Sequence, residues 1–192
     1  MIEKITKNLI DQAVKVLASG GVLVTATETA YGLAADATNK KAVERIYKIK
    51  GRSFKKFLPL ILGSNCKVRE YFKVNGKENR LLIDHKGLSI VLPVKNKEIY
   101  LLPGQETCAV RVSTGSFIRA IAKKLGRPIT ATSANKAGGG NCYSVDEVLA
   151  QIKESEVDMI IDGGKLKKKK PSTIVKVIGK EIKVLRQGEI KC

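Results

Sequence analysis

Helical and extended patterns alternate along the whole chain, and this alternation restricts the possible folds more than any other feature of the sequence. Apolar residues recur at helical spacing over 9–17, 42–47 and 117–125, and a capping box at 144–147 predicts a fourth helix. Short apolar runs predict strands over 22–24, 58–62, 88–92, 109–112, 129–132, 159–161 and 174–177. Interleaved helices and strands are typical of an α/β protein, so we expect a three-layer fold around a twisted mixed sheet.

The domain organisation follows from length and composition. The chain has 192 residues, which one domain accommodates, and no segment rich in proline and serine divides it. Hydrophobic residues make up 43% of the chain, which is enough for a core and unlike the composition of a disordered protein. The last predicted element is a hairpin over 176–185 that turns at Gly179-Lys180. We therefore expect a single domain over residues 1–192.

The charge of the chain is strongly positive and evenly spread. Lysine and arginine total 36 against 18 acidic residues, which gives a formal net charge of +18. The excess is +10 up to Asn96 and +8 after it, so the whole body is basic and there is no detachable basic arm. A nucleotide, an RNA or both would suit this charge, whereas a lysine-rich composition that only keeps the protein in solution explains it as well.

The cysteines and the N-terminal residues indicate the compartment. Four cysteines lie far apart, and with a single histidine, His85, they make a structural zinc site improbable. Scattered thiols fit a reducing compartment. The first residues lack the apolar run of a signal peptide, and no later stretch reaches the roughly 20 apolar residues of a membrane span. We expect a cytoplasmic protein with no membrane partner.

Three segments carry side chains suited to a ligand site. Residues 25–33 follow a buried strand as a hydroxyl-rich loop, and open α/β sheets place ligand loops at such strand ends. Lys50-Gly51-Arg52 combines two cations with a glycine at a helix end, which suits a phosphate. Residues 130–135 end another strand in hydroxyls and an amide before the glycines at 138–140. Taken alone, the first two also fit a loop that satisfies its own backbone and a solvated helix end.

The most familiar nucleotide motifs are absent from the sequence. It contains neither G-x-x-x-x-G-K-[ST] nor a G-x-G-x-x-G that opens a helix. Arg111 lies within a predicted strand and Arg186 near the end of the last one, where a charge is costly unless it reaches a polar site. An exposed strand face explains both arginines as well. For His85 we expect a surface or structural role.

Seven short blocks occur in a fixed order: TETAYGL at 27–33, KGR at 50–52, AVR at 109–111, SAN at 133–135, DGG at 162–164, STIV at 172–175 and LRQG at 185–188. Together they resemble the YrdC/Sua5 family over nearly the whole chain. The resemblance implies a YrdC-like domain of the short, single-domain form. It also implies a nucleotidyltransferase that joins L-threonine, bicarbonate and ATP into L-threonylcarbamoyladenylate with release of pyrophosphate. Another enzyme complex would then transfer the threonylcarbamoyl group to tRNA.

The resemblance also implies the site residues by position. Catalysis would depend on Lys50, Arg52, Ser133 and Asn135. The same four would bind ATP together with Lys56, Thr107, Asn141 and Arg186. L-Threonine would contact Thr29, Arg111, Ala131 and Ser172. Mg²⁺ is expected as the cofactor that accompanies ATP, and no residue is assigned to a resident metal.

Two other functions stay open at this point. Dihydroxybutanone-phosphate synthase shares the sheet architecture, but it relies on clustered carboxylates and histidine around Mg²⁺, whereas this chain has one histidine and few acidic residues. An RNA-binding YrdC-like protein that makes no adenylate would suit the charge, while the intact blocks favour the enzyme. The lysines between Lys165 and Lys170 would contact tRNA or only solvate a loop.

Overall fold

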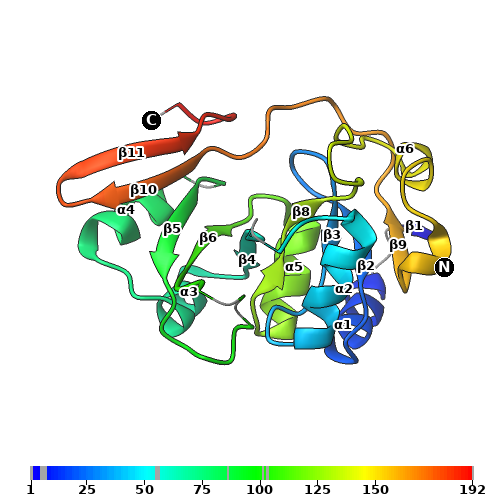
Figure 1. Ribbon diagram of the computed structural model, residues 1–192, viewed down its shortest axis with the longest axis horizontal. Helices are drawn as coiled ribbons and strands as arrows, with labels where there is room; N and C mark the ends of the chain where they lie inside the picture. Colours follow the sequence, from blue (N-terminus) through cyan, green and yellow to red (C-terminus); the bar gives the residue numbers. More distant parts are fainter. Residues whose placement is uncertain are drawn as a thin grey trace.

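The computed structural model describes residues 2–4, 8–54, 57–85, 87–100, 102 and 104–191, and its strands form two mixed sheets where the sequence predicted one (Figure 1). The first sheet has the order β1-β9-β2-β3-β8, with β1, β9 and β2 parallel and β3 antiparallel to both of its neighbours. Its strands are β1 (Ile2–Lys4), β2 (Leu23–Ala26), β3 (Tyr31–Ala34), β8 (Thr132–Ser133) and β9 (Met159–Asp162).

The second sheet has the order β11-β10-β5-β6-β4-β7. Its pairs β10–β5 and β4–β6 are parallel, and the other pairs are antiparallel. Its strands are β4 (Leu60–Leu62), β5 (Ser89–Pro93), β6 (Thr107–Val112), β7 (Ile129–Thr130), β10 (Ile174–Ile178) and β11 (Glu181–Arg186). The predicted hairpin is confirmed as β10–β11, with its turn at 179–180, and it forms one edge of this sheet.

Six α-helices and one 3₁₀ turn lie between the strands of the described chain: α1 (Leu9–Ala18), α2 (Lys40–Lys50), α3 (Asn65–Tyr71), α4 (Gly76–Asp84), α5 (Ser116–Leu125), α6 (Val145–Leu149) and η1 (Glu154–Glu156). Several of these helices have a side chain that caps the first turn. The Asn39 side chain accepts from the Ala42 amide at 3.1 Å, and the Ser144 hydroxyl accepts from the Glu147 amide at 3.3 Å. The Glu147 carboxylate accepts from the Tyr143 amide instead of completing a box with Ser144. The sequence pattern also placed Ile152 on this helix, but α6 ends at Leu149.

Alternating apolar side chains divide the interior into layers. In β2, Leu23 packs in a cluster with α1 and α5, whereas Val24 packs in a cluster with α2 and α6. In β4, Ile61 joins the same α1 and α5 cluster, whereas Leu60 and Leu62 face the cluster of α3 and α4. One helical layer therefore covers both sheets on one side, and two helix pairs cover the other side. This arrangement confirms the predicted three-layer α/β class.

Residues 25–33 form a hairpin, where the sequence pattern predicted a loop. β2 and β3 pair antiparallel, and only 27–30 turn between them, with the Thr27 hydroxyl donating to the Ala30 carbonyl at 2.7 Å. Gly32 interrupts the apolar pattern by which this strand could have been predicted. Glycine is needed there because a Cβ would lie 3.1 Å from the Thr132 carbonyl oxygen in β8. The hydroxyl-rich turn is therefore held rigidly by paired strands.

The single strand predicted over 129–132 is divided between the two sheets. β7 pairs with β4 in the second sheet, and β8 pairs with β3 in the first. Ala131 lies between them, and its amide donates to the Pro59 carbonyl at 2.8 Å. This short segment therefore joins the two sheets, and the polar residues of 130–133 lie at the junction.

None of the helices in the described part of the chain is both long and apolar enough to cross a membrane.

Candidate functional site

A cavity of about 250 Å³ lies where the two sheets meet. It is bounded by the β2–β3 hairpin, the segment that links β7 to β8, the end of β6, and the strand β11 with the chain that precedes β10. The predicted site residues on its wall are Thr29, Arg52, Arg111, Ala131, Ser133, Asn141, Ser172 and Arg186. Six of the seven blocks, all but DGG at 162–164, are thus brought to one cavity.

Lys50 lies behind this wall and does not line the cavity. It is the last residue of α2, is only 3% exposed, and donates to the carbonyl oxygens of Ser133 at 2.6 Å and Asn135 at 2.9 Å. Its third donor meets the Asn135 side-chain oxygen at 2.9 Å. Burial, assisted by the charge of Arg52, lowers the pKa of Lys50 from 10.5 to about 8. Lys50 therefore holds the loop that carries Ser133.

Asn135 completes this network from the loop side. Its side-chain oxygen also accepts from the Ser133 hydroxyl, and its amide nitrogen donates to the Gly139 carbonyl. Asn135 is buried, whereas Ser133 reaches the cavity. Of the four residues that the resemblance assigns to catalysis, Arg52 and Ser133 face the cavity, and Lys50 and Asn135 support them from behind.

Arg52 reaches the cavity because α2 ends in a tight turn. Gly51 adopts the left-handed conformation that ends the helix, and the Arg52 amide donates back to the Tyr47 carbonyl at 3.1 Å. The guanidinium donates to the Phe57 carbonyl at 3.2 Å, and its buried Nε has no partner among the described residues. Burial lowers the pKa of Arg52. A guanidinium with spare donors at a cavity wall suits an anionic ligand.

Arg111 is a buried charge with one acidic partner. Its side chain is 8% exposed, and its Nη2 lies 3.3 Å from Glu28 Oε1. The other oxygen of Glu28 accepts from the Ser113 hydroxyl at 2.7 Å. Burial lowers the pKa of Arg111, and the charge of Glu28 opposes this shift. Arg111 Nε has no partner among the described residues, so the guanidinium keeps a free donor.

Arg186, the last residue of β11, also lines the cavity and donates to Ser172. It donates to the Ser172 carbonyl at 2.7 Å and to the Ser172 hydroxyl at 3.0 Å, and the Ser89 hydroxyl lies 3.1 Å from that hydroxyl. Burial lowers the pKa of Arg186, and the positive charge of Arg111 adds to this effect. Two guanidiniums therefore share one cavity, which favours a ligand with negative charge.

Tyr31 contributes to the site in a way that the sequence did not reveal. Its buried hydroxyl donates to the Gly164 carbonyl at 2.7 Å and accepts from the Gly163 amide at 3.0 Å. Asp162 Oδ1 lies 3.2 Å from the same hydroxyl oxygen, and burial raises the pKa of Tyr31 to about 12. Tyr31 thereby joins the TETAYGL and DGG blocks. The sequence did not reveal this role, because residues 25–33 were predicted as a loop and Tyr31 was therefore not expected to be buried in a strand.

Of the described residues predicted to bind ATP, Thr107 lies away from the cavity, whereas Lys50 and Asn135 lie behind its wall. Thr107 begins β6, whereas Arg111 lies four residues further along the same strand. At a rise of about 3.3 Å per residue, the two side chains are separated by roughly 13 Å. Thr107 pairs with Pro93 away from the cavity lining. Lys56 lies outside the described residues.

The lining is cationic and rich in hydroxyls. The described residues that line the cavity include three arginines and several threonines and serines, and they include no carboxylate and no histidine. The described part of the chain also contains no cluster of three or more histidine, cysteine or acidic residues that could hold a metal ion. His85 caps the end of α4 on the surface. The site is thus built to bind an anionic, hydroxyl-bearing ligand without an acid or base on its lining.

Comparison with known proteins identifies the family. The family model for Sua5, YciO and YrdC proteins, described as "Telomere recombination", matches residues 15–188. The chain belongs to this family. The resemblance stated from the seven blocks is therefore confirmed.

Two relatives match the chain over almost its full length. A putative threonylcarbamoyl-AMP synthase of Methanocaldococcus jannaschii is 30% identical over 98% of this chain and 89% of its own. A threonylcarbamoyl-AMP synthase of Vibrio vulnificus is 31% identical over 93% of this chain and 98% of its own. Among solved structures, Sua5 of P. abyssi complexed with L-threonine superposes with a TM-score of 0.89 at 27% identity. The match covers 98% of this chain and 57% of that longer protein.

Proposed function

We propose that the protein is a threonylcarbamoyl-AMP synthase. The observation that carries this proposal is the convergence of Arg52, Arg111 and Arg186 with hydroxyl side chains on one cavity whose described lining holds no carboxylate. ATP and L-threonine both bring negative charge, and L-threonine also brings a hydroxyl. The two threonylcarbamoyl-AMP synthases that match over almost the whole chain, and the L-threonine complex of P. abyssi Sua5, support the same substrates.

The reaction that we propose has two bond-forming steps. The amino nitrogen of L-threonine forms a bond to the carbon of bicarbonate, and water and a proton leave, which produces a carbamate. A carbamate oxygen then forms a bond to the α-phosphorus of ATP, and the bond from that phosphorus to the leaving pyrophosphate breaks. The products are L-threonylcarbamoyladenylate and pyrophosphate. No covalent bond to the protein is needed, so the protein acts by positioning and by charge.

The roles of the side chains follow from where they lie. We assign Arg52 to the phosphates, where its unpaired buried Nε offers a donor for the charge that develops on the leaving pyrophosphate. Ser133 lies on the same side of the cavity and is held by the Lys50–Asn135 network. We assign Arg111 to the carboxylate of L-threonine, with Ser172 and Thr29 as hydrogen-bond partners for the amino acid.

The cofactor expected with this substrate is Mg²⁺ that accompanies ATP. The described residues provide no cluster of carboxylates for a resident ion. We therefore propose that Mg²⁺ enters with ATP, where phosphate oxygens and water are its usual ligands, and that it neutralises phosphate charge. The arginines of the cavity would bind the remaining charge.

The product implies further partners. An acyl adenylate is a reactive mixed anhydride, so a second enzyme must consume it, and we propose a threonylcarbamoyl-transferase complex that modifies tRNA. We propose a cytoplasmic location, because the described cysteines Cys66, Cys108 and Cys142 are free thiols. Cys192 lies outside the described residues.

The test measures pyrophosphate and an AMP-linked product from L-threonine, bicarbonate, ATP and Mg²⁺. We expect turnover to require both L-threonine and bicarbonate, since the attacking oxygen exists only after the carbamate forms. Serine should be a poorer substrate, because one lost methyl contact costs about 1–3 kcal/mol, and valine should be poorer still because it leaves polar groups unpaired. Equal pyrophosphate release with valine, or without an amino acid, would contradict the proposal.

A further inference from the structure

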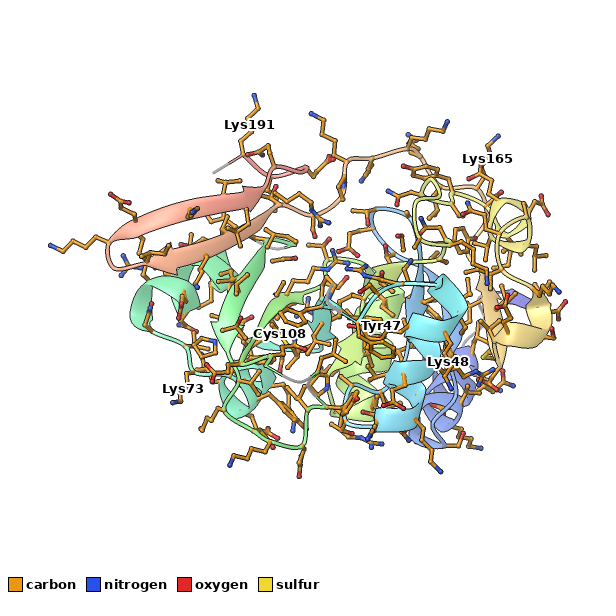
Figure 2. All side chains as sticks on the ribbon, viewed as in Figure 1. Tyr47, Lys48, Lys73, Cys108, Lys165 and Lys191 are labelled. Atoms are coloured by element: carbon orange, nitrogen blue, oxygen red, sulfur yellow. The ribbon has the colours of Figure 1, made fainter. Side chains whose placement is uncertain are left out.

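The end of α2 determines where two residues of the cavity lie. Arg52 follows this helix after one glycine, and Ser133 begins the loop 133–137, which is hydrogen-bonded to the helix end. Figure 2 shows Tyr47 on the side of α2 that faces Cys108 of β6, and Lys48 on the opposite side. Tyr47 is buried and holds the helix against the second sheet. The spacing between Arg52 and Ser133 therefore depends on how the helix end is joined to the loop.

The loop completes the hydrogen bonding of the helix end. An α-helix leaves its last four carbonyl oxygens without partners inside the helix. In α2 these carbonyls belong to residues 47–50, and the first two accept from the amides of 51–52. The last one accepts from the Ala137 amide at 2.7 Å. The remaining one, of Ile49, accepts from the side-chain ammonium of Lys136 at 2.7 Å.

The contacts between α2 and the loop run in both directions. Lys50 donates from the helix to the Ser133 and Asn135 carbonyls, whereas Lys136 donates from the loop to the helix. Because the two lysines are anchored on opposite partners, together they prevent the loop from sliding along the helix. Lys50 is buried, but the side chain of Lys136 is 43% exposed. Lys136 can therefore be replaced without opening a void in the core.

Glu156 holds the ammonium of Lys136 in this position. Its two carboxylate oxygens lie 2.8 and 3.1 Å from Lys136 Nζ, and one of them also accepts from the Lys153 amide at 2.9 Å. The Glu156 carbonyl accepts from Arg45 of α2 at 2.8 Å, so the turn η1 is itself bound to the helix. The ammonium thus lies between a helix carbonyl and a fixed carboxylate. A cation at this end of a helix also interacts favourably with the helix dipole.

We propose that Lys136 and Glu156 are a positioning pair that sets Arg52 and Ser133 at the spacing required by the phosphates of ATP. The inference rests on the proposed function for the identity of the ligand. Lys136 is not part of the cavity lining, so it acts through the loop and the helix end. A small displacement of groups that hold a reacting phosphate is enough to lower binding and rate.

The positioning pair should act on ATP and leave L-threonine unaffected. The residues that we assign to L-threonine are carried by other elements: Arg111 lies on β6, and Ser172 lies on the segment before β10. A change in the affinity for ATP alone is therefore the signature of this pair, whereas general damage to the fold would weaken the binding of both substrates.

The test compares two lysines whose ion pairs have similar exposure. Lys136→Met removes the ammonium and keeps the length of the side chain. Lys67→Met is the matched control, because Lys67 lies 2.8 Å from Glu70 and its side chain is 39% exposed. Figure 1 shows α3, which carries Lys67, far from α6, and Figure 2 shows Lys73, just after α3, at the opposite end of the molecule from Lys48.

Calorimetry gives the Kd of a non-hydrolysable ATP analogue with Mg²⁺, and pyrophosphate release gives the KM for each substrate. In Lys136→Met we expect the Kd and the KM for ATP to rise about tenfold, as expected for one lost hydrogen bond to a charged group. The KM for L-threonine should change less than about twofold, and Lys67→Met should change neither substrate by more than this. The two methionine variants should unfold at similar urea concentrations.

Two further variants test the chemistry of the positioning pair. Lys136→Arg should restore most of the affinity for the analogue, because a guanidinium can donate to the Ile49 carbonyl and to Glu156 at once. Glu156→Gln should raise the Kd about threefold in the wild type and add nothing in Lys136→Met, since residues that act through one contact are not additive. Additive effects, or no restoration by arginine, would overturn the pair.

The outcomes also separate this inference from the proposed function. A wild type that binds the analogue but releases no pyrophosphate overturns the synthase alone, and calorimetry then decides on the positioning pair. A wild type that binds no analogue overturns both. Equal rises in the two KM values of Lys136→Met, or equal losses of analogue binding in Lys136→Met and Lys67→Met, would overturn the positioning pair while the synthase stands.

Discussion

Lys50 illustrates at the scale of one residue how a buried charge can organise a site without lining its cavity. All three of its donors meet oxygens of Ser133 and Asn135. Methionine has a similar volume but cannot donate, so the Asn135 carbonyl loses its partner, whereas the Ser133 carbonyl keeps the Asn135 amide and the Asn135 side-chain oxygen keeps the Ser133 hydroxyl. A buried acceptor left unpaired costs about 1–3 kcal/mol. We expect Lys50→Met to abolish most pyrophosphate release, with ATP binding weakened through the displaced loop. Retained activity in Lys50→Met would show that the loop needs no ammonium.

The pKa of Lys50 predicts opposite effects of pH on stability and activity. Its value is about 8 in the folded protein against 10.5 in the unfolded chain. Between these values the unfolded chain binds more protons, so the contribution of Lys50 to the free energy of unfolding rises with pH, by about 3 kcal/mol at most. The neutral amine has one donor fewer for the loop, so activity should fall above about pH 8.

This prediction is checked by urea unfolding and pyrophosphate release at matched pH values. The difference in free energy of unfolding between the wild type and Lys50→Met should shift in favour of the wild type from pH 8 upward. Comparison with Lys50→Met removes the titration of the other groups. Activity and stability that fall together above pH 8 would contradict the assignment.

Glu28 acts on the ligand through Arg111. It lies 3.3 Å from Arg111 Nη2 and is itself held by the Ser113 hydroxyl. Glu28→Gln keeps the shape and the hydrogen bond but removes the charge that orients the guanidinium. We expect the KM for L-threonine to rise about tenfold, equivalent to about 1.4 kcal/mol, with the KM for ATP unchanged. Steady-state assays with each substrate varied would show this, and an equal rise in both KM values would point to general damage to the cavity.

At the scale of elements, the end of β11 is set by a very close contact. A Cβ at Gly188 would lie 2.0 Å from the Pro171 carbonyl oxygen and 2.6 Å from the Thr173 nitrogen. Gly188→Ala must therefore push β11 away from the segment before β10, which separates Arg186 from Ser172. Overpacking of this kind costs about 1–3 kcal/mol.

We expect Gly188→Ala to lose most pyrophosphate release and to unfold at lower urea. Gly76→Ala is the matched control, because a Cβ at this first residue of α4 meets nothing within 4 Å. The control should keep full activity and the same or a higher urea midpoint. Full activity in Gly188→Ala would show that the Arg186–Ser172 contact is dispensable.

Individual elements also show what the sequence could and could not predict. Helix α2 and the β10–β11 hairpin were predicted because periodicity, the Asn39 cap and the Gly179-Lys180 turn are local signals. The division of 129–132 between two sheets was not, because pairing with β3 or β4 is decided by chain segments far away. The two helices α3 and α4 were also absent from the predicted elements, although Asn75 and Glu78 form a capping box.

The candidate site was predictable to a similar degree. Eight residues assigned by the order of the blocks line one cavity, because each block keeps its place at the end of a strand or helix. The supporting contacts were not predictable. The Lys50 network and the Tyr31 bonds to 163–164 depend on how separate elements pack, and Thr107 lies at the wrong end of β6 for the cavity.

At the scale of the whole molecule, the cavity lies at the junction of the two sheets, so its ligands should couple them. Arg52, Arg111 and Arg186 approach it from different elements, and the charges of Arg111 and Arg186 repel each other. We expect MgATP at about 100 times its Kd to add about 2.7 kcal/mol to the free energy of unfolding, because it binds only the folded protein. L-Threonine at about 100 times its own Kd should add a similar amount.

The distribution of this stabilisation is the sharper prediction. Hydrogen exchange should slow in β3 of the first sheet and in β6 of the second, because Thr29 lies in the turn before β3 and Arg111 lies in β6. Arg111→Met should remove the response to L-threonine in both sheets and leave the response to MgATP. Slower hydrogen exchange in one sheet only would mean that the ligands contact one wall of the cavity and do not couple the two sheets.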